Sequence, residues 1–280
     1  MLTGKPNYPK GKIFKNYNHF FVEQEKYKKN IEVYRVPIIP RGNGNNIMKI
    51  LNYLSFIFSS IIFLFIRSQK LKYDLIFVYA PSPVIHSLIG VYLKKIKKIP
   101  MIVWLQDLWP VSLESSGQIK NKLLIKFIQN LVNYIYSKVD LMLIQSMAYK
   151  KHLKGKISNS KVFYIPNAFR DHKKQILKKP NKNFNIFYCG NIGKVQEFNS
   201  IVYAAKEIQK KKLNINFIFF GEGVNKNLLK KKIIENKLKN FFIKDHVSLK
   251  KLIKELTYAD TLYVSLKNFK ELNLTVPSKI

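Results

Sequence analysis

The sequence predicts an α/β protein with two doubly wound parallel-sheet domains. The first observation is that apolar, strand-like runs alternate with helix-like segments along most of the chain. The second is a polar, Lys-rich stretch without periodicity, interrupted by Pro180, that separates two such series. The third is length, since 280 residues are enough for two domains of ordinary size.

The first series supplies a predicted domain at residues 1–170. Residues 101–105 are an uninterrupted apolar run, which is typical of a buried strand. Residues 121–138 carry apolar side chains at the spacing i, i+3, i+4 and i+7, which predicts an amphipathic helix. We expect strands at 75–80, 101–105, 141–145 and 162–165, and helices at 84–95 and 121–138.

The second series follows a predicted linker at residues 171–184 and supplies a domain at residues 185–280. The same alternation predicts a second parallel sheet here. We expect strands at 185–188, 216–220 and 261–264, and helices at 200–211, 226–237 and 249–258.

Four Asp residues differ in their position relative to the predicted strands. Asp74, Asp140 and Asp260 each stand just before a strand, which predicts turn or cap residues at the N-terminal edge of a sheet. Asp107 instead follows the strand at 101–105. Ligands bind at the C-terminal ends of strands in open parallel sheets, so Asp107 is the best candidate for a functional acid.

The composition is strongly basic, with 50 Lys and Arg against 16 Asp and Glu and a formal net charge of +34. This charge suits anionic lipid or nucleic acid. Arg is scarce, however, and base recognition favours Arg, which argues against nucleic acid. Codon bias with solvated Lys faces and a membrane-surface role both stay open. The single cysteine, Cys189, excludes an internal disulfide and suits a reducing cytosol.

Residues 50–66 carry no charge and are rich in Phe, Ile and Leu. The run is slightly shorter than the roughly 20 residues that a spanning helix needs. Three readings stay open: a helix buried between sheet and surface, a helix dipping into one leaflet, and a true membrane span.

Two glycine-containing turns follow predicted strands of the second domain, at residues 190–193 and 221–223. Such turns suit the close approach of a diphosphate. Glu222, within the second turn, either caps the next helix or faces a ligand hydroxyl. The His residues show no metal-ligand spacing, so we predict no metal site.

Five short motifs occur in order along the chain: QDLWP at 106–110, IPN at 165–167, GNIG at 190–193, GEG at 221–223 and TVPSK at 275–279. Together they resemble retaining glycosyltransferase family 4, in particular the bacterial aminosugar transferases of capsule and O-antigen assembly. The resemblance covers nearly the whole chain. It implies the GT-B fold, in which two Rossmann-like domains face a cleft and the second domain binds most of the donor.

The resemblance also implies site residues. Asp107 corresponds to the catalytic acidic position, with Gln106, Trp109 and Asn167 on the acceptor side of the cleft. Retaining members are thought to let the leaving phosphate help to deprotonate the acceptor, so no second carboxylate, metal or other cofactor is implied. The donor-binding positions are Gly190, Asn191, Gln196, Glu222, Asp245, His246, Ser278 and Lys279.

The implied reaction is transfer of a sugar from a nucleotide sugar, a UDP-aminosugar, to a polyprenyl-linked glycan acceptor in cell-surface polysaccharide synthesis. The run at 50–66 and the Lys excess lead us to expect a cytoplasmic protein held peripherally on the inner face of the bacterial plasma membrane, with an anionic membrane surface as a partner. Two alternatives stay open: a sugar-nucleotide epimerase of the same fold, and a non-catalytic basic module that binds membrane or nucleic acid.

The chain departs from the family pattern in two respects. Glu197 stands where members usually have Gly, and an acid near a diphosphate is unfavourable unless it points away. Members also begin with a strand and a glycine-rich loop before a stretch like residues 2–9, and they continue beyond the TVPSK motif. We therefore expect both domains to be incomplete and this chain to be inactive alone.

Overall fold

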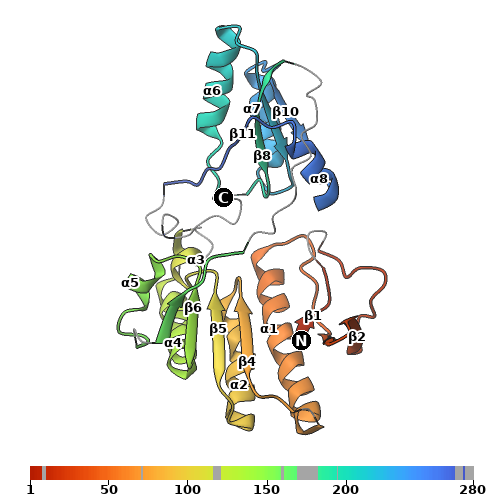
Figure 1. Ribbon diagram of the computed structural model, residues 1–280, viewed down its shortest axis with the longest axis vertical. Coiled ribbons are helices and arrows are strands. Elements are labelled where there is room, and N and C mark those ends of the chain that lie inside the picture. The colour runs from red at the N-terminus through yellow and green to blue at the C-terminus, as the bar shows by residue number, and fades with distance from the viewer. Residues whose placement is uncertain are drawn as a thin grey trace. The chain divides into compact units, whose positions relative to one another are not determined.

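The chain divides into two compact units, Met1–Pro166 and Asn167–Ile280. Figure 1 shows the computed structural model with the helices and strands of both units labelled. The structure describes residues 1–7, 11–70, 72–115, 121–158, 161–168, 182–193, 195–268 and 274. Most of the predicted linker therefore lies outside the described residues.

The first unit contains a parallel sheet, as the sequence predicts, and its strand order is β4-β5-β6-β7. Adjacent strands pair without a register shift, so that Val103 of β5 lies opposite Val78 of β4 and Met142 of β6. Each strand begins and ends within one residue of its predicted bounds. The strands are β4 (Ile76–Ala80), β5 (Met101–Leu105), β6 (Leu141–Ile144) and β7 (Val162–Tyr164).

Helices cover one face of this sheet. Met101, Val103 and Leu105 point to this face and are fully buried. Here α2 packs on β4 and β5, and α4 packs beside α2. On the opposite face Phe77 and Tyr79 are about half exposed, and both rings contact Trp104. The helical segments are η2 (Val84–Ser87), α2 (Leu88–Lys97), α3 (Val111–Ser115), α4 (Lys122–Lys138) and α5 (Tyr149–Leu153).

A separate three-stranded sheet, which the sequence did not predict, precedes the first helix. Its order is β1-β3-β2, with β1 parallel and β2 antiparallel to the central strand. The middle strand carries the buried residues Val33 and Val36, whereas β2 reads EQEKYK and lacks apolar alternation. The strands are β1 (Leu2–Gly4), β2 (Glu23–Lys28) and β3 (Ile31–Val36).

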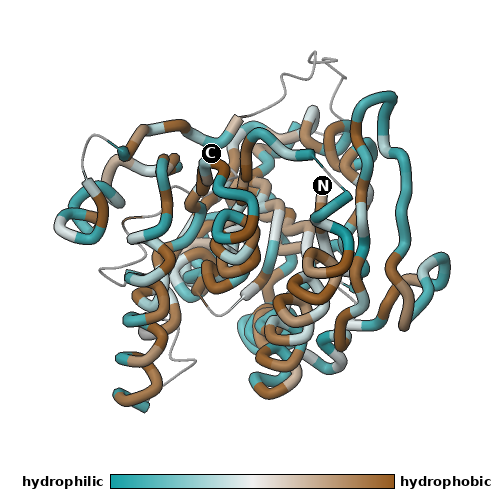
Figure 2. Tube along the Cα trace, turned by 90° about the horizontal axis from the view of Figure 1, so that it is seen from below, coloured by the Kyte–Doolittle hydropathy of each residue, from teal (hydrophilic) through white to brown (hydrophobic). Residues whose placement is uncertain are grey.

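The apolar run of the sequence lies within helix α1 (Asn46–Arg67), which continues into η1 (Ser68–Lys70). The Asn45 side chain caps this helix by accepting a hydrogen bond from the Met48 N–H at 2.8 Å. One side of α1 packs against β1, β3 and α2. Only 28% of its most apolar window is buried, which argues against the first of the three readings, a helix buried between sheet and surface. By length and composition alone, this helix could cross a membrane. Its tube is brown along most of its length in Figure 2.

The second unit contains a parallel sheet with the order β10-β9-β8-β11. Its core is aromatic, since Phe219 stacks on Tyr188 with ring centroids 4.8 Å apart and contacts Phe241 at 4.7 Å. The short strand β10 was not predicted. The elements are β8 (Phe184–Cys189), α6 (Asn199–Lys210), β9 (Ile215–Phe220), α7 (Lys226–Glu235), β10 (Phe241–Lys244), α8 (Leu249–Leu256) and β11 (Thr261–Leu262).

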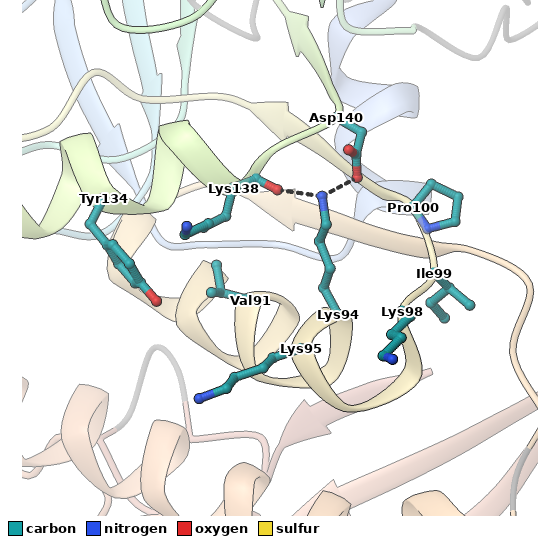
Figure 3. Close-up of a pocket in the computed structure, with 9 residues that line it drawn as sticks. All are labelled: Val91, Lys94, Lys95, Lys98, Ile99, Pro100, Tyr134, Lys138 and Asp140. Carbon is teal, nitrogen blue, oxygen red and sulfur yellow. Dashed lines mark hydrogen bonds and ion pairs between the residues drawn. The ribbon is translucent and has the colours of Figure 1, made fainter.

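Two of the predicted cap residues fasten strand starts, as expected. Asp140 accepts a hydrogen bond from the Met101 N–H at 2.8 Å, and Asp260 accepts one from the Asn185 N–H at 2.8 Å. Asp140 also pairs with Lys94, whose ammonium group donates to the Lys138 carbonyl at 2.8 Å (Figure 3). Burial opposes the change, but the hydrogen bonds from Lys94 and Met101 lower the pKa of Asp140.

The surroundings of this ion pair form a basic pocket of about 750 Å³ between the ends of α2 and α4 (Figure 3). It lies at the N-terminal edge of the sheet, away from the strand ends where ligands bind. Its lining includes Lys94, Lys95, Lys98 and Lys138 with Asp140. Because Asp140 and a carbonyl already hold Lys94, we assign this pocket a structural role.

We expect Asp140→Asn to lower the free energy of unfolding at pH 7 by less than about 1 kcal/mol, because the pair is partly exposed and the amide oxygen can still accept from Met101. A lowered folded-state pKa stabilises the fold above the unfolded pKa of about 3.9, and this contribution is lost as the pH falls through the folded pKa. Urea unfolding, followed by Trp104 and Trp109 fluorescence, should show the difference at pH 7. The difference should shrink as the pH falls below about 3.9 and through the lowered pKa of folded Asp140, and a difference that stays constant over this range would contradict the ion-pair explanation.

Candidate functional site

The loops that follow β4, β5 and β6 meet at the C-terminal edge of the first sheet. Because the strands are parallel and in constant register, Ala80, Leu105 and Ile144 end at the same level. The Gln106 N–H donates to the Ala80 carbonyl at 3.0 Å, which joins the first two loops. This edge therefore carries the QDLWP loop that the sequence singles out.

Asp107 is surrounded by neutral hydrogen-bond donors. The Ser112 hydroxyl donates to its Oδ2 atom at 3.1 Å. The Trp109 indole, only 7% exposed, donates to Ser82 at 3.0 Å and so ties the β4 loop to the β5 loop. Burial raises the pKa of Asp107, although hydrogen bonds from Ser112, Ser82, Trp109 and the Leu108 N–H oppose the change. The fold thus holds a carboxyl group in a site that disfavours its charge, which is typical of a functional acid.

Gln106 is held beside Asp107 by a second polar group that the sequence did not reveal. The buried Tyr149 hydroxyl donates to the Gln106 carbonyl at 3.0 Å and accepts from the Gln145 amide at 3.0 Å. The Gln106 amide nitrogen is itself buried and has no partner among the described residues. Gln145 directly follows β6 at this edge, and this position at a strand end could have identified it from the sequence.

The two glycine turns of the second unit touch one another at the C-terminal ends of β8 and β9. The Ile192 N–H donates to the Glu222 carbonyl at 2.8 Å. A Cβ atom on Gly221 would lie 1.9 Å from the Gly190 oxygen, and one on Gly223 would lie 2.3 Å from the Ile192 oxygen. The glycines are therefore required by the contact between the two loops, whether or not a ligand approaches them.

A buried lysine fastens these loops to the end of β10. The Lys226 ammonium group, on a residue 8% exposed, contacts Glu222 Oε1 and Asp245 Oδ1 at 2.6 Å each. Burial alone would lower the pKa of Lys226, but the hydrogen bonds to both carboxylates raise it. The Lys226 hydrogen bond in turn lowers the pKa of Asp245. The structure gives α7 no side-chain cap, which corrects the reading of Glu222 as a cap.

Sequence reasoning missed Lys226, although it stands four residues after Glu222 at the start of a helix. That spacing predicts an ion pair, and it was the available signal.

The remaining donor-side residues near Gly190 support the loop from within. The Gln196 side chain accepts from the Gly193 N–H at 2.9 Å, and the Tyr188 hydroxyl donates to the Asn191 carbonyl. The Glu197 carboxylate accepts from the Asn199 N–H at the start of α6. The unusual acid is thus turned toward the positive end of a helix.

The other predicted site residues are not brought together by a described contact. His246 follows β10 and is exposed, as is Asn167 at the first position of the second unit. Ser278 and Lys279, with the rest of the TVPSK motif, lie outside the described residues. Within the part of the chain that the structure describes, no group of three or more His, Cys, Asp or Glu side chains could hold a metal ion.

Several solved structures resemble this chain. A TarM mutant from S. aureus, in complex with fondaparinux, α-GlcNAc-glycerol and UDP, gives a TM-score of 0.51 at 14% identity over 74% of this chain and 40% of that one. Anabaena HepE with UDP-glucose gives 0.55 at 13% identity, over 83% and 60%. The pneumococcal O-GlcNAc transferase GtfA with UDP and GlcNAc gives 0.53 at 14% identity, over 86% and 49%. No family model and no curated protein matches the chain.

These likenesses show the fold. The chain has two Rossmann-like parallel sheets and the α/β fold of the GT-B glycosyltransferases. It spans between 40% and 60% of the length of those three structures. The activity, substrates and partners of the whole protein are therefore proposals.

We expect Gly221→Ala to lower the free energy of unfolding of the second unit by about 1–3 kcal/mol or more, because the new methyl group would overlap the Gly190 carbonyl. Urea unfolding followed by far-ultraviolet circular dichroism measures this loss. Gly44→Ala, in the first unit, is the control, since its Cβ meets nothing within 4 Å and it introduces only backbone strain of about 1–2 kcal/mol there. An undiminished stability of Gly221→Ala would mean that the loops do not touch.

Proposed function

We propose that this chain is part of a retaining glycosyltransferase that moves a sugar from a UDP-aminosugar to a lipid-linked, polyprenyl-borne glycan acceptor. The reaction would take place at the inner face of the bacterial plasma membrane, in cell-surface polysaccharide synthesis. The observation that carries this proposal is the partly buried Asp107, held at the C-terminal edge of a Rossmann-like sheet by neutral donors. The two glycine turns of the second unit, which contact each other, provide the candidate site for the donor diphosphate.

The donor half of the proposal rests on the second unit. Glycine-containing loops at the C-terminal ends of parallel strands are a position at which diphosphates commonly bind. A nucleotide diphosphate is also the ligand of the proteins of similar fold, which were crystallised with UDP or UDP-glucose. In this proposal Gly190, Asn191 and Gln196 lie at the diphosphate, and Asp245 and His246 at the base. Lys279 would supply a cation for the charge that grows on the leaving phosphate.

The acceptor half rests on Asp107. In the proposed step, the acceptor hydroxyl oxygen forms a bond to the anomeric carbon while the bond from that carbon to the phosphate oxygen breaks. The bonding electron pair leaves with UDP, and the acceptor proton passes to the leaving phosphate. Asp107 orients the sugar or acceptor hydroxyl and stabilises the oxocarbenium-like centre by its negative charge. Gln106, Trp109 and Asn167 would line the acceptor side.

We expect UDP to bind the protein and Lys226→Met to weaken this binding about tenfold, because Glu222 and Asp245 would lose the cation that joins their loops. Isothermal titration calorimetry with UDP measures the effect. Lys231→Met is the matched control, since Lys231 lies on the same helix, is 73% exposed and pairs only at the surface with Glu235. Failure of the unsubstituted protein to bind UDP would refute the donor assignment.

In the full-length enzyme of this proposal, we expect Asp107→Asn to reduce sugar transfer by about a hundredfold while UDP affinity stays unchanged, because the substitution keeps the shape of the side chain and removes its charge. A radiolabelled UDP-sugar and a polyprenyl-linked acceptor provide the assay. Unchanged turnover would remove Asp107 from the mechanism.

The same assays separate the two alternatives. Conversion of the nucleotide sugar to an isomer without an acceptor would indicate an epimerase. Steeply salt-dependent DNA binding without any thermal shift from UDP would indicate a basic binding module.

A further inference from the structure

Helix α1 presents a continuous stripe of large apolar side chains to solvent. Its members recur every three or four residues, so they lie along one side of the helix. Phe58 is 69% exposed and Phe65 is 73% exposed, and no other member is less than 39% exposed. The stripe consists of Ile47, Ile50, Leu51, Leu54, Phe58, Ile62, Phe65 and Ile66.

The other side of α1 is fixed to the first unit by packing and by polar contacts. Phe63 and Leu64 are buried against the three-stranded sheet and α2. The Asn52 side chain donates to the Ile39 carbonyl at 2.6 Å and accepts from the Arg41 side chain at 3.2 Å. A helix held in this way can rest against a surface with its stripe, whereas crossing a bilayer would place Asn52 in hydrocarbon without these partners.

The positive charge around α1 indicates which kind of surface the stripe would contact. No acidic residue occurs between Glu32 and Asp74 in the sequence, whereas Arg67, Lys70 and Lys72 follow the stripe. The whole chain carries a formal net charge of +34. A second copy would bring two strongly positive chains together, while an anionic lipid surface complements the charge.

We propose that the exposed stripe of α1 is a membrane-docking surface, on which the helix lies in the plane of an anionic bilayer while its inner side stays packed on the first unit. Helices of this kind bury their apolar face at the boundary between headgroups and acyl chains. The proposal concerns where and how the protein meets a membrane, and it does not depend on the identity of the sugar or on the role of Asp107.

The test is co-sedimentation of the protein with phosphatidylcholine vesicles prepared with and without phosphatidylglycerol. We expect binding to the anionic vesicles at low salt and at least about tenfold weaker binding of the double variant Phe58→Ser, Phe65→Ser, because two exposed apolar anchors are lost. The matched control is Tyr203→Ser, Ile234→Ser, which removes two equally exposed apolar side chains from α6 and α7 (67% and 75%) and should bind like the unsubstituted protein. Arg67→Gln with Lys70→Gln should reduce the salt dependence of binding.

Alkaline carbonate should release the bound protein, since a peripheral helix is not anchored across the bilayer. Resistance to carbonate would replace docking by a true span and overturn the proposal. Equal binding of the stripe variant and the control would overturn it as well. The proposal would also be overturned if sedimentation velocity showed a dimer for the unsubstituted protein and a monomer for the stripe variant. The stripe would then be an interface with a second copy. UDP calorimetry on the same variants should be unaffected, so the outcome is separate from that of the proposed function.

Discussion

Parallel pairing at a constant register is the constraint on which the candidate site residues of each unit depend. In the first unit it places Ala80, Leu105 and Ile144 at one level, and in the second it places Cys189 opposite Phe220. Loops that are distant in sequence therefore leave each sheet side by side. Asp140 and Asp260 fasten the opposite edges, where each carboxylate accepts a hydrogen bond from an N–H group near the start of a neighbouring strand. A slip of one residue would exchange the buried and exposed faces of a strand and also separate the loops.

The two loop clusters solve the problem of buried polar groups in opposite ways. Around Lys226, a buried cation meets two carboxylates that reach solvent, so each charge has a partner. Around Asp107 the donors are neutral and burial raises the pKa, so the ionised carboxylate is less favourable in the folded chain than in the unfolded one. The first arrangement orders loops and favours the fold. The second opposes the fold at neutral pH, and functional sites commonly hold groups in this way.

The sequence predicted the elements that bury apolar runs between turns, and β5 begins and ends at its predicted residues. It could not predict β2, because the EQEKYK run is largely exposed on both faces and has no alternation of apolar and polar residues. This strand forms through its pairing with β3, which leaves no periodic pattern in its own sequence. Asp107 could be found because its position at a strand end is a local property. The Ser82 and Tyr149 contacts could not, since they join loops that only the sheet topology brings together. Lys226 resembled the many other Lys residues until its burial was known.

Strand β4 leads into the loop in which Ser82 contacts Trp109, and it also affects the behaviour of the protein in solution. Among the described residues β4 pairs with β5 alone, so its other edge is open, and Phe77 and Tyr79 stand about half exposed on one face. The run LIFVYA at 75–80 has high β-propensity and contains neither charge nor Pro. An open edge with this composition can template cross-β fibrils. Repulsion between chains of net charge +34 opposes such stacking, so added salt should promote fibrils by screening it, and dilute buffer should keep the protein dispersed.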